Sequence, residues 1–137
     1  MQRFWKASLL IAAAQILPAY TAVMPEHLLN LDAIMDRSQS QFRAHGKYPS
    51  TFGELGIVLF CFDRNGGENV RPSPKAGPVW TAPGCRNIYR IYHPNQGTFS
   101  VYAINRQGRI VEGRNANITP QTPKCIEGMP ASCLPPA

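Results

Sequence analysis

An uncharged, largely apolar segment near the N-terminus constrains this chain more than any other feature. Residues 7–23 contain no charged side chain, and the six residues before them include Arg3 and Lys6 but no acidic residue. As a helix this segment would rise about 25 Å, slightly less than the roughly 30 Å hydrocarbon core of a bilayer. Because the positive end of such a segment stays in the cytoplasm, we expect the rest of the chain to lie outside it.

Two interpretations of residues 1–23 fit this pattern. The first is a cleavable signal peptide, although a cut after Ala22 would place the bulky Tyr20 where a small residue is preferred. The second is a retained membrane helix, with Trp5 and Tyr20 at the two interfaces. The side chains that would form the membrane or assembly helix are Leu9, Leu10, Ile11, Ile16, Leu17, Pro18 and Tyr20.

Four cysteines follow the apolar segment, at Cys61, Cys85, Cys125 and Cys133. They contain no C-x-x-C pair, and the three histidines lack a ligand spacing relative to them, so we expect no metal site. An even number of cysteines behind a leader predicts two disulfides, for which three connectivities are possible. We favour Cys61–Cys85 and Cys125–Cys133, because each closes a short loop. Such bonds contribute about 2–4 kcal/mol each and require an oxidising compartment.

The remaining residues, 24–137, are enough for one small domain and too few for two. The whole chain has a net charge of +6, and without Arg3 and Lys6 the domain has about +4. This mild excess of positive charge permits binding to nucleic acids or anionic surfaces without requiring it.

An amphipathic helix is predicted over residues 24–45. Its apolar stripe contains Leu28, Leu31, Met35 and Phe42 with Ile34 beside it, whereas Asn30 falls among the polar residues elsewhere. Gly46 suits the C-terminal cap, and Pro49 prevents continuation. We expect the stripe to face the core.

The next residues predict a short helix and a buried strand. Ser50 and Thr51 with Glu54 are typical of a capped helical turn, which Gly56 would end. Residues 57–62 are apolar and rich in branched and aromatic side chains, which favours a strand. Residues 63–87 contain many prolines and glycines and predict a long irregular loop, braced by the first disulfide.

Three antiparallel strands are predicted at residues 87–92, 98–104 and 109–112, joined by turns at 93–97 and 105–108. Their alternating pattern gives a small meander that needs a cover on its apolar face, and the helix is the only candidate large enough. The fold class is therefore α+β, with the long helix packed on the meander. From Gly113 the tail lacks periodicity, and we expect order only in its Cys125–Cys133 loop.

No catalytic motif is present, and we expect neither an enzyme nor a cofactor. Glu54 and Asp63 are interpreted as surface charges, and His93 as structural or exposed. Residues 63–68 predict a plain turn rather than a calcium site. The glycosylation sequon at residues 117–119 is interpreted as a chance occurrence.

Five arginines are interleaved with tyrosines in the predicted meander. Hairpin geometry could bring several of them to one solvent-exposed face that contacts nucleic acid or another polyanion, although a merely solvated face is the simpler interpretation. These residues are Arg86, Arg90, Arg106, Arg109 and Arg114.

The order of these elements resembles type IV pilins and the pseudopilins of type II secretion. The strongest motif is G-x-Y-P-[ST] at residues 46–51, about 25 residues beyond the apolar segment, followed by the apolar Leu55. Residues 16–20 resemble the I-P-x-Y stretch of the pilin membrane helix. Residues 89–94, 99–103 and 106–108 resemble the family's final hairpin. The two C-terminal cysteines resemble its disulfide-bounded loop.

The resemblance implies a structural subunit that polymerises through its N-terminal helix with itself or with other pilin-like subunits, anchored in the inner membrane or exported into a filament. The family's prepilin peptidase site is absent before Ser8, and so is the acidic residue buried in the filament core. We therefore expect either a start upstream of Met1 or a relative with an ordinary leader. The alternative function is a secreted, disulfide-braced binding module or inhibitor released from a signal peptide.

Overall fold

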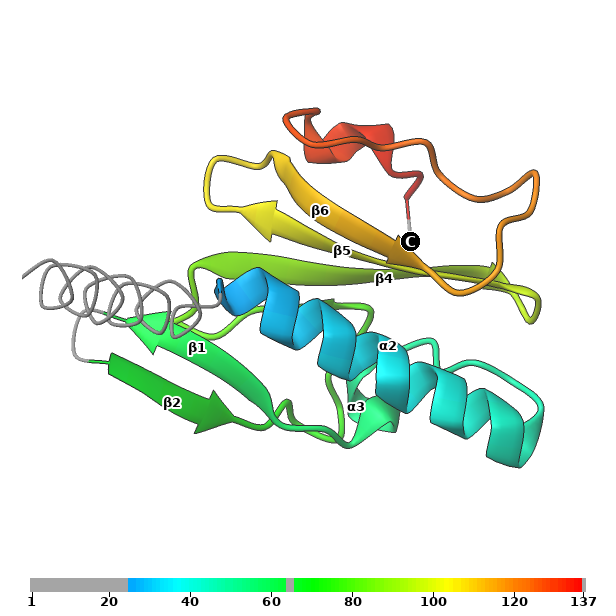
Figure 1. Ribbon diagram of the computed structural model, residues 1–137, viewed down its shortest axis with the longest axis horizontal. Helices are drawn as coiled ribbons and strands as arrows, with labels where there is room; N and C mark the ends of the chain where they lie inside the picture. The colour runs from blue at the N-terminus through cyan, green and yellow to red at the C-terminus, as the bar shows by residue number, and fades with distance from the viewer. Residues whose placement is uncertain (1–24, 64–65, 137) are drawn as a thin grey trace, which may run out of the picture.

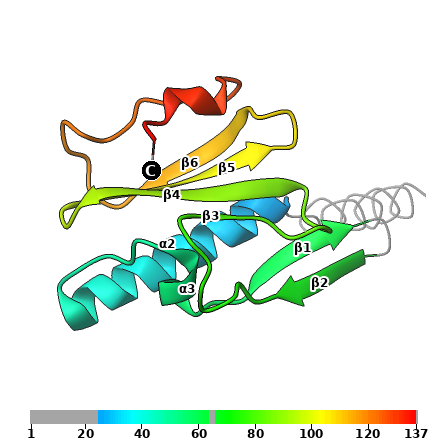
Figure 2. The same cartoon turned by 180° about the vertical axis from the view of Figure 1, so that it is seen from behind.

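The long helix, α2 (Glu26–His45), lies diagonally across one face of an antiparallel sheet (Figures 1 and 2). The computed structural model describes residues 25–63 and 66–136. Gly46 ends the helix as predicted, with φ of 74° and its N–H donating to the Phe42 carbonyl at 2.8 Å. Glycine suits this position because the left-handed conformation is disfavoured for other residues.

The buried side of α2 is less apolar than the sequence predicts. Leu31 and Ile34 are fully buried as expected, but Leu28, Met35 and Phe42 are only partly buried. Asn30, predicted to lie off the stripe, is 2% exposed, and Glu26 and Ser38 are buried with it. The prediction that Asn30 lies on the polar side of the helix was wrong. Its amide forms hydrogen bonds to the backbone of a neighbouring strand, and the periodicity of the helix does not indicate such bonds.

The main sheet has four antiparallel strands in the order β3 (Val79–Trp80), β4 (Asn87–Asn95), β5 (Thr98–Asn105) and β6 (Ile110–Asn115). The predicted three-stranded meander is confirmed. The turn at 105–108 is confirmed as well, since the Gly108 N–H donates to the Asn105 carbonyl at 3.0 Å. Strand β4 runs three residues further than predicted, to Asn95.

A separate hairpin pairs β1 (Leu59–Asp63) with β2 (Gly66–Val70). The prediction that residues 63–87 form one irregular loop was wrong, because β2 and β3 both lie within it. Each pairs with an apolar strand whose edge needs hydrogen-bonding partners. Gly67 leaves room in β2 for the Phe60 ring across the hairpin, which would have to shift if this position carried a side chain.

The segment between α2 and β1 forms the predicted capped helix, α3 (Phe52–Leu55). The Thr51 Oγ1 accepts the Glu54 N–H at 3.2 Å, and the Glu54 carboxylate accepts the Ser50 N–H at 3.1 Å. Just before it, the buried Tyr48 ring stacks between Phe42 and Phe99, with centroids 4.4 and 5.2 Å away. The 46–51 motif therefore fastens the end of α2 to the β4–β5 hairpin.

Both faces of the main sheet are covered. Phe99, Val101 and Ala103 pack on the side of α2, whereas Tyr102 and Ile104 form a second cluster on the other side with Ile110 and Leu134. The C-terminal segment, including the short helix η1 (Ala131–Cys133), covers this second cluster (Figure 1). The expectation of order only within the Cys125–Cys133 loop was wrong, because the apolar side chains on the second face also need a cover.

Both disulfides have the favoured connectivity. Cys61–Cys85 joins β1 to the residues before β4, with Cα atoms 4.6 Å apart, so it links the hairpin to the main sheet. Cys125–Cys133 closes the loop before Leu134, with Cα atoms 5.9 Å apart. Two disulfides in one small domain indicate an oxidising compartment, extracellular or periplasmic.

Leu134 provides a test of the C-terminal cover, since it is only 4% exposed. Leu134→Ala should lower the free energy of unfolding by about 2–4 kcal/mol, because a large side chain is removed from a packed cluster. Urea unfolding of the oxidised protein followed by circular dichroism measures this change. The control Ile118→Ala, at a side chain that is 84% exposed, should change stability by less than about 0.5 kcal/mol. Equal stability of the two variants would contradict this cover.

Candidate functional site

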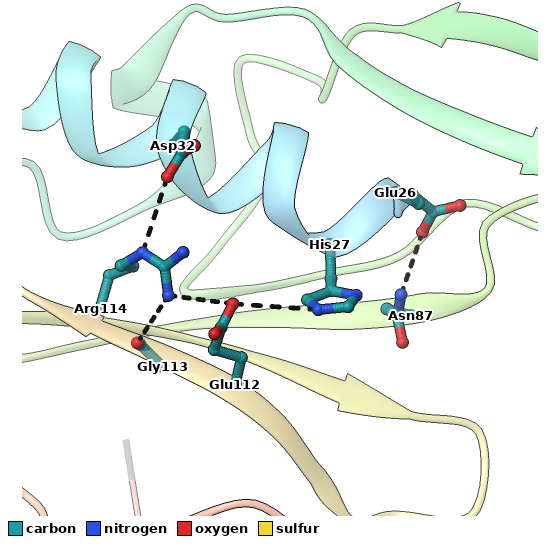
Figure 3. A network of polar contacts seen from close by, with 7 residues as sticks. All are labelled: Glu26, His27, Asp32, Asn87, Glu112, Gly113 and Arg114. Carbon is teal, nitrogen blue, oxygen red and sulfur yellow. Dashed lines mark hydrogen bonds and ion pairs between the residues drawn. The ribbon is translucent and has the colours of Figure 1, made fainter. Parts of the chain in front are cut away.

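A buried carboxylate holds the first turn of α2 in the domain. Glu26 is 4% exposed, and one of its oxygens, Oε2, accepts the Phe62 N–H of β1 at 2.9 Å and the Arg86 N–H at 3.3 Å. Its Oε1 accepts the Tyr89 hydroxyl at 3.1 Å and the Asn87 amide at 3.4 Å, both from β4 (Figure 3 shows Glu26 and Asn87). The carboxylate thus joins α2, β1 and β4 at the point where the N-terminal segment meets the domain.

Asn30, one helical turn further along, continues this network. Its side chain donates to the Phe60 carbonyl and accepts the Phe60 N–H, both at 2.8 Å, and so pairs with β1 as a neighbouring strand would. It also donates to the Tyr89 hydroxyl at 3.0 Å. Burial raises the pKa of Tyr89 well above its ordinary value, and the nearby Glu26 charge raises it further. Sequence reasoning missed this network; the available signal was two polar residues spaced i, i+4 on a core-facing helix.

A second, more exposed network joins α2 to β6 (Figure 3). Arg114 contacts the Glu112 carboxylate at 3.0 Å and the Asp32 carboxylate at 3.6 Å, and His27 lies 3.8 Å from Glu112. These side chains are partly exposed, so the pairs contribute little energy individually. They connect α2 to β6, the strand at one edge of the main sheet.

The five candidate arginines do not share one face. Arg90 lies opposite Tyr102 and Arg114 opposite Val101, so these two project from opposite sides of the sheet. Arg90 donates to the Pro135 carbonyl, Arg106 to the Cys85 carbonyl at 2.6 Å, and Arg109 to the Gly128 carbonyl at 2.8 Å. Arg86 is exposed. The guanidinium groups of Arg90, Arg106 and Arg109 thus satisfy carbonyls of irregular segments. Nucleic-acid binding stays a prediction.

A pocket of about 350 Å³ lies where β4 enters the β4–β5 hairpin. Within it, the His93 Nδ1 lies 2.7 Å from the Thr98 carbonyl and must donate, because a carbonyl only accepts. The ring also packs near Tyr48 and Phe99, with both centroids 6.3 Å away. His93 is therefore held as a structural element of a mostly apolar pocket. The lining residues are Ser50, Thr51, Pro78, Ile91, Tyr92, His93, Pro94 and Pro136.

The remaining candidate residues do not form a recognisable chemical centre. Glu54 caps α3, and Asp63 ends β1. Within residues 25–63 and 66–136, no three His, Cys, Asp or Glu side chains converge as metal ligands would. In the sequon, Asn117 is exposed, while the Thr119 hydroxyl bonds to that of Thr98 at 2.7 Å.

Comparison with protein-family models, with curated proteins and with solved structures finds no match to this chain. The membrane or assembly residues Leu9, Leu10, Ile11, Ile16, Leu17, Pro18 and Tyr20 lie outside the described residues. In the part of the chain that the structure describes, no helix has the length and apolarity to span a bilayer.

Glu26 can be tested by removing its charge while keeping its shape. Glu26→Gln should lower the free energy of unfolding by about 2–3 kcal/mol, because an amide accepts fewer bonds and turns a donor toward buried N–H groups. Chemical denaturation measures the change. Asp36→Asn, the same chemical change at an exposed position of α2, should alter stability by less than about 0.5 kcal/mol. A Glu26→Gln protein as stable as the Asp36→Asn control would show that the charge is dispensable.

The buried phenols predict a loss of stability in alkali. Burial raises the pKa of Tyr89 and of Tyr102 above 10.0, so above pH 10 the folded chain retains protons that the unfolded chain releases. The free energy of unfolding should therefore fall as pH rises above 10, by at most about 1.4 kcal/mol per pH unit for Tyr89. Urea titrations at pH 8, 10 and 11 measure this slope. Tyr89→Phe should flatten it, and an unchanged slope would contradict the assignment.

Proposed function

We propose that this protein is a structural subunit of an extracellular filament of the type IV pilus or pseudopilus kind, and that it is not an enzyme. The observation that carries the proposal is the anchoring of α2 by Glu26 immediately after the apolar segment at residues 7–23. A buried charge that joins three elements holds the first turn of α2 on the domain in one fixed orientation. A subunit that assembles through its N-terminal segment requires such a fixed connection.

The order of the elements also supports the proposal. The long helix is followed by the G-x-Y-P-[ST] motif, which fastens it to the hairpin through Tyr48. An antiparallel sheet lies beneath the helix, and a disulfide-closed segment covers the opposite face. This is the arrangement that the resemblance to pilins implies. The absence of a recognisable catalytic cluster among the described residues is compatible with a structural role.

In this proposal the two parts of the chain have separate tasks. Residues 7–23 hold the subunit in the inner membrane and then pack against the same segment of other subunits. The domain lies outside the cytoplasm, and its sheet and disulfide loops form the filament surface. DNA contact is not included, because Arg106 and Arg109 donate to carbonyls of their own domain and Arg114 pairs with acidic side chains.

The pocket beside His93 is the observation that favours the alternative, a secreted binding module or inhibitor. The two functions differ in the fate of the N-terminal segment. A filament subunit retains residues 7–23, whereas a released module loses them.

Fractionation and mass spectrometry of the full chain expressed in a bacterial host test the proposal. We expect a membrane-bound protein that retains residues 7–23, lacks four hydrogens because of its two disulfides, and forms filaments visible by electron microscopy after detergent removal. Leu10→Arg should abolish filaments without unfolding the domain, because a charge in the apolar segment opposes its burial. The control Ile118→Arg, at an exposed position, should still form filaments. A soluble monomer cut near Ala22 would contradict the proposal and favour the binding module.

A further inference from the structure

The Cys61–Cys85 disulfide lies directly beside the buried carboxylate of Glu26. The two backbone N–H groups that donate to Oε2 of Glu26, at 2.9 and 3.3 Å, belong to Phe62 and Arg86. Each of these residues directly follows one of the two bonded cysteines in the sequence. The disulfide therefore joins the two chain segments at the position where they present both donors to one carboxylate oxygen.

In the part of the chain that the structure describes, no strand ladder joins these two segments. Strand β1 pairs with β2 in a sheet separate from the one that contains β4. The loop that carries Cys85 is held to the main sheet, because the Arg106 guanidinium donates to the Cys85 carbonyl at 2.6 Å. Strand β1 is therefore the side that would move if the disulfide were open.

Opening the disulfide would separate the donors that Glu26 requires. The two cysteines are 24 residues apart, so without the bond only packing and side-chain hydrogen bonds oppose the entropy of the open loop. The hydrogen bonds of a buried carboxylate are directional, and the charge is strongly destabilised when a donor moves away. The disulfide thus preorganises the site that holds the first turn of α2.

The two disulfides differ in their access to solvent. Cys61 and Cys85 are 0% and 3% exposed, whereas Cys125 and Cys133 are partly exposed. A thiolate must reach a disulfide sulfur in order to reduce it. The folded domain therefore shields Cys61–Cys85 once it has formed, whereas Cys125–Cys133 stays open to exchange.

We propose that formation of the Cys61–Cys85 bond fixes α2 on the sheet, so that the start of the helix takes its final position only in an oxidising compartment. In this step the two thiols lose two protons and two electrons to a disulfide donor, whose own disulfide becomes a dithiol. The Phe62 and Arg86 N–H groups are then aligned for Glu26. This inference does not depend on the filament role, because a released binding module would require the same step.

The reciprocity of coupling provides the test. If the disulfide strengthens the hydrogen bonds of Glu26, those bonds favour the disulfide by the same factor. The full oxidised chain in detergent is equilibrated with mixtures of reduced and oxidised dithiothreitol, and free thiols are alkylated. Peptide mass spectrometry then gives the oxidised-to-reduced ratio of each disulfide. Glu26→Gln should lower the ratio for Cys61–Cys85 about tenfold or more, and that for Cys125–Cys133 by less than about threefold.

Leu134→Ala is the matched control, because it destabilises the opposite face of the main sheet. Leu134 packs with Cys125 and Cys133 in the second cluster. This variant should lower the ratio for Cys125–Cys133 and change that for Cys61–Cys85 by less than about threefold. If either variant weakened both disulfides alike, Glu26 would act only through global stability, and the inference would be overturned. An unchanged Cys61–Cys85 ratio in Glu26→Gln would overturn it as well.

Hydrogen exchange locates the effect within the chain. In Cys61→Ala/Cys85→Ala, the amides of Phe62, Arg86 and the first turn of α2 should exchange about tenfold or more faster, whereas the amides of β5 keep their protection. Cys125→Ala/Cys133→Ala should leave the amides at the start of α2 unchanged. Loss of protection throughout the main sheet in the first variant would show that the disulfide holds the whole domain, and would overturn a specific role at the helix start.

Discussion

The carboxylate of Glu26 accepts hydrogen bonds from two separate segments, β1 and the residues at the start of β4, and the arrangement of the helix depends on them. Its donors are backbone N–H groups of Phe62 and Arg86 and side chains of β4. A buried carboxylate without such partners would be strongly destabilising, so the first turn of α2 has one acceptable position on β1 and β4. Apolar contacts alone would let the helix slide along the sheet, because they are not directional. The hydrogen bonds of Glu26 hold it at one position.

The rest of the fold follows from covering two sheet faces. Helix α2 and the β1–β2 hairpin cover one face, and the C-terminal segment covers the other. The disulfides act where packing alone is weak. Cys61–Cys85 links the hairpin to the strand that carries Tyr89, and Cys125–Cys133 shapes the loop that precedes Leu134. A domain of this size has a limited core, so such cross-links contribute a substantial share of its stability.

This construction gives the molecule distinct ends. The pocket beside His93 lies at the β4–β5 end of the main sheet, whereas the Cys125–Cys133 loop bonds to the β5–β6 end. The two ends of the sheet therefore differ in the surfaces that they present.

The sequence by itself determined the local elements and favoured, among three possible connectivities, the disulfide pairing that the structure has. Helix α2, the capped turn at α3 and the β4–β6 meander follow from periodicity, capping residues and turn residues, which are local signals. Only the tertiary structure decided the roles of Asn30, of the arginines and of the C-terminal segment. Asn30 is buried because the Phe60 backbone lies opposite it, Arg90 and Arg114 separate because β4 and β6 present them on opposite faces, and Leu134 is buried against Tyr102. These outcomes depend on partners distant in the chain, and no local pattern specifies which distant backbone or face a side chain will meet.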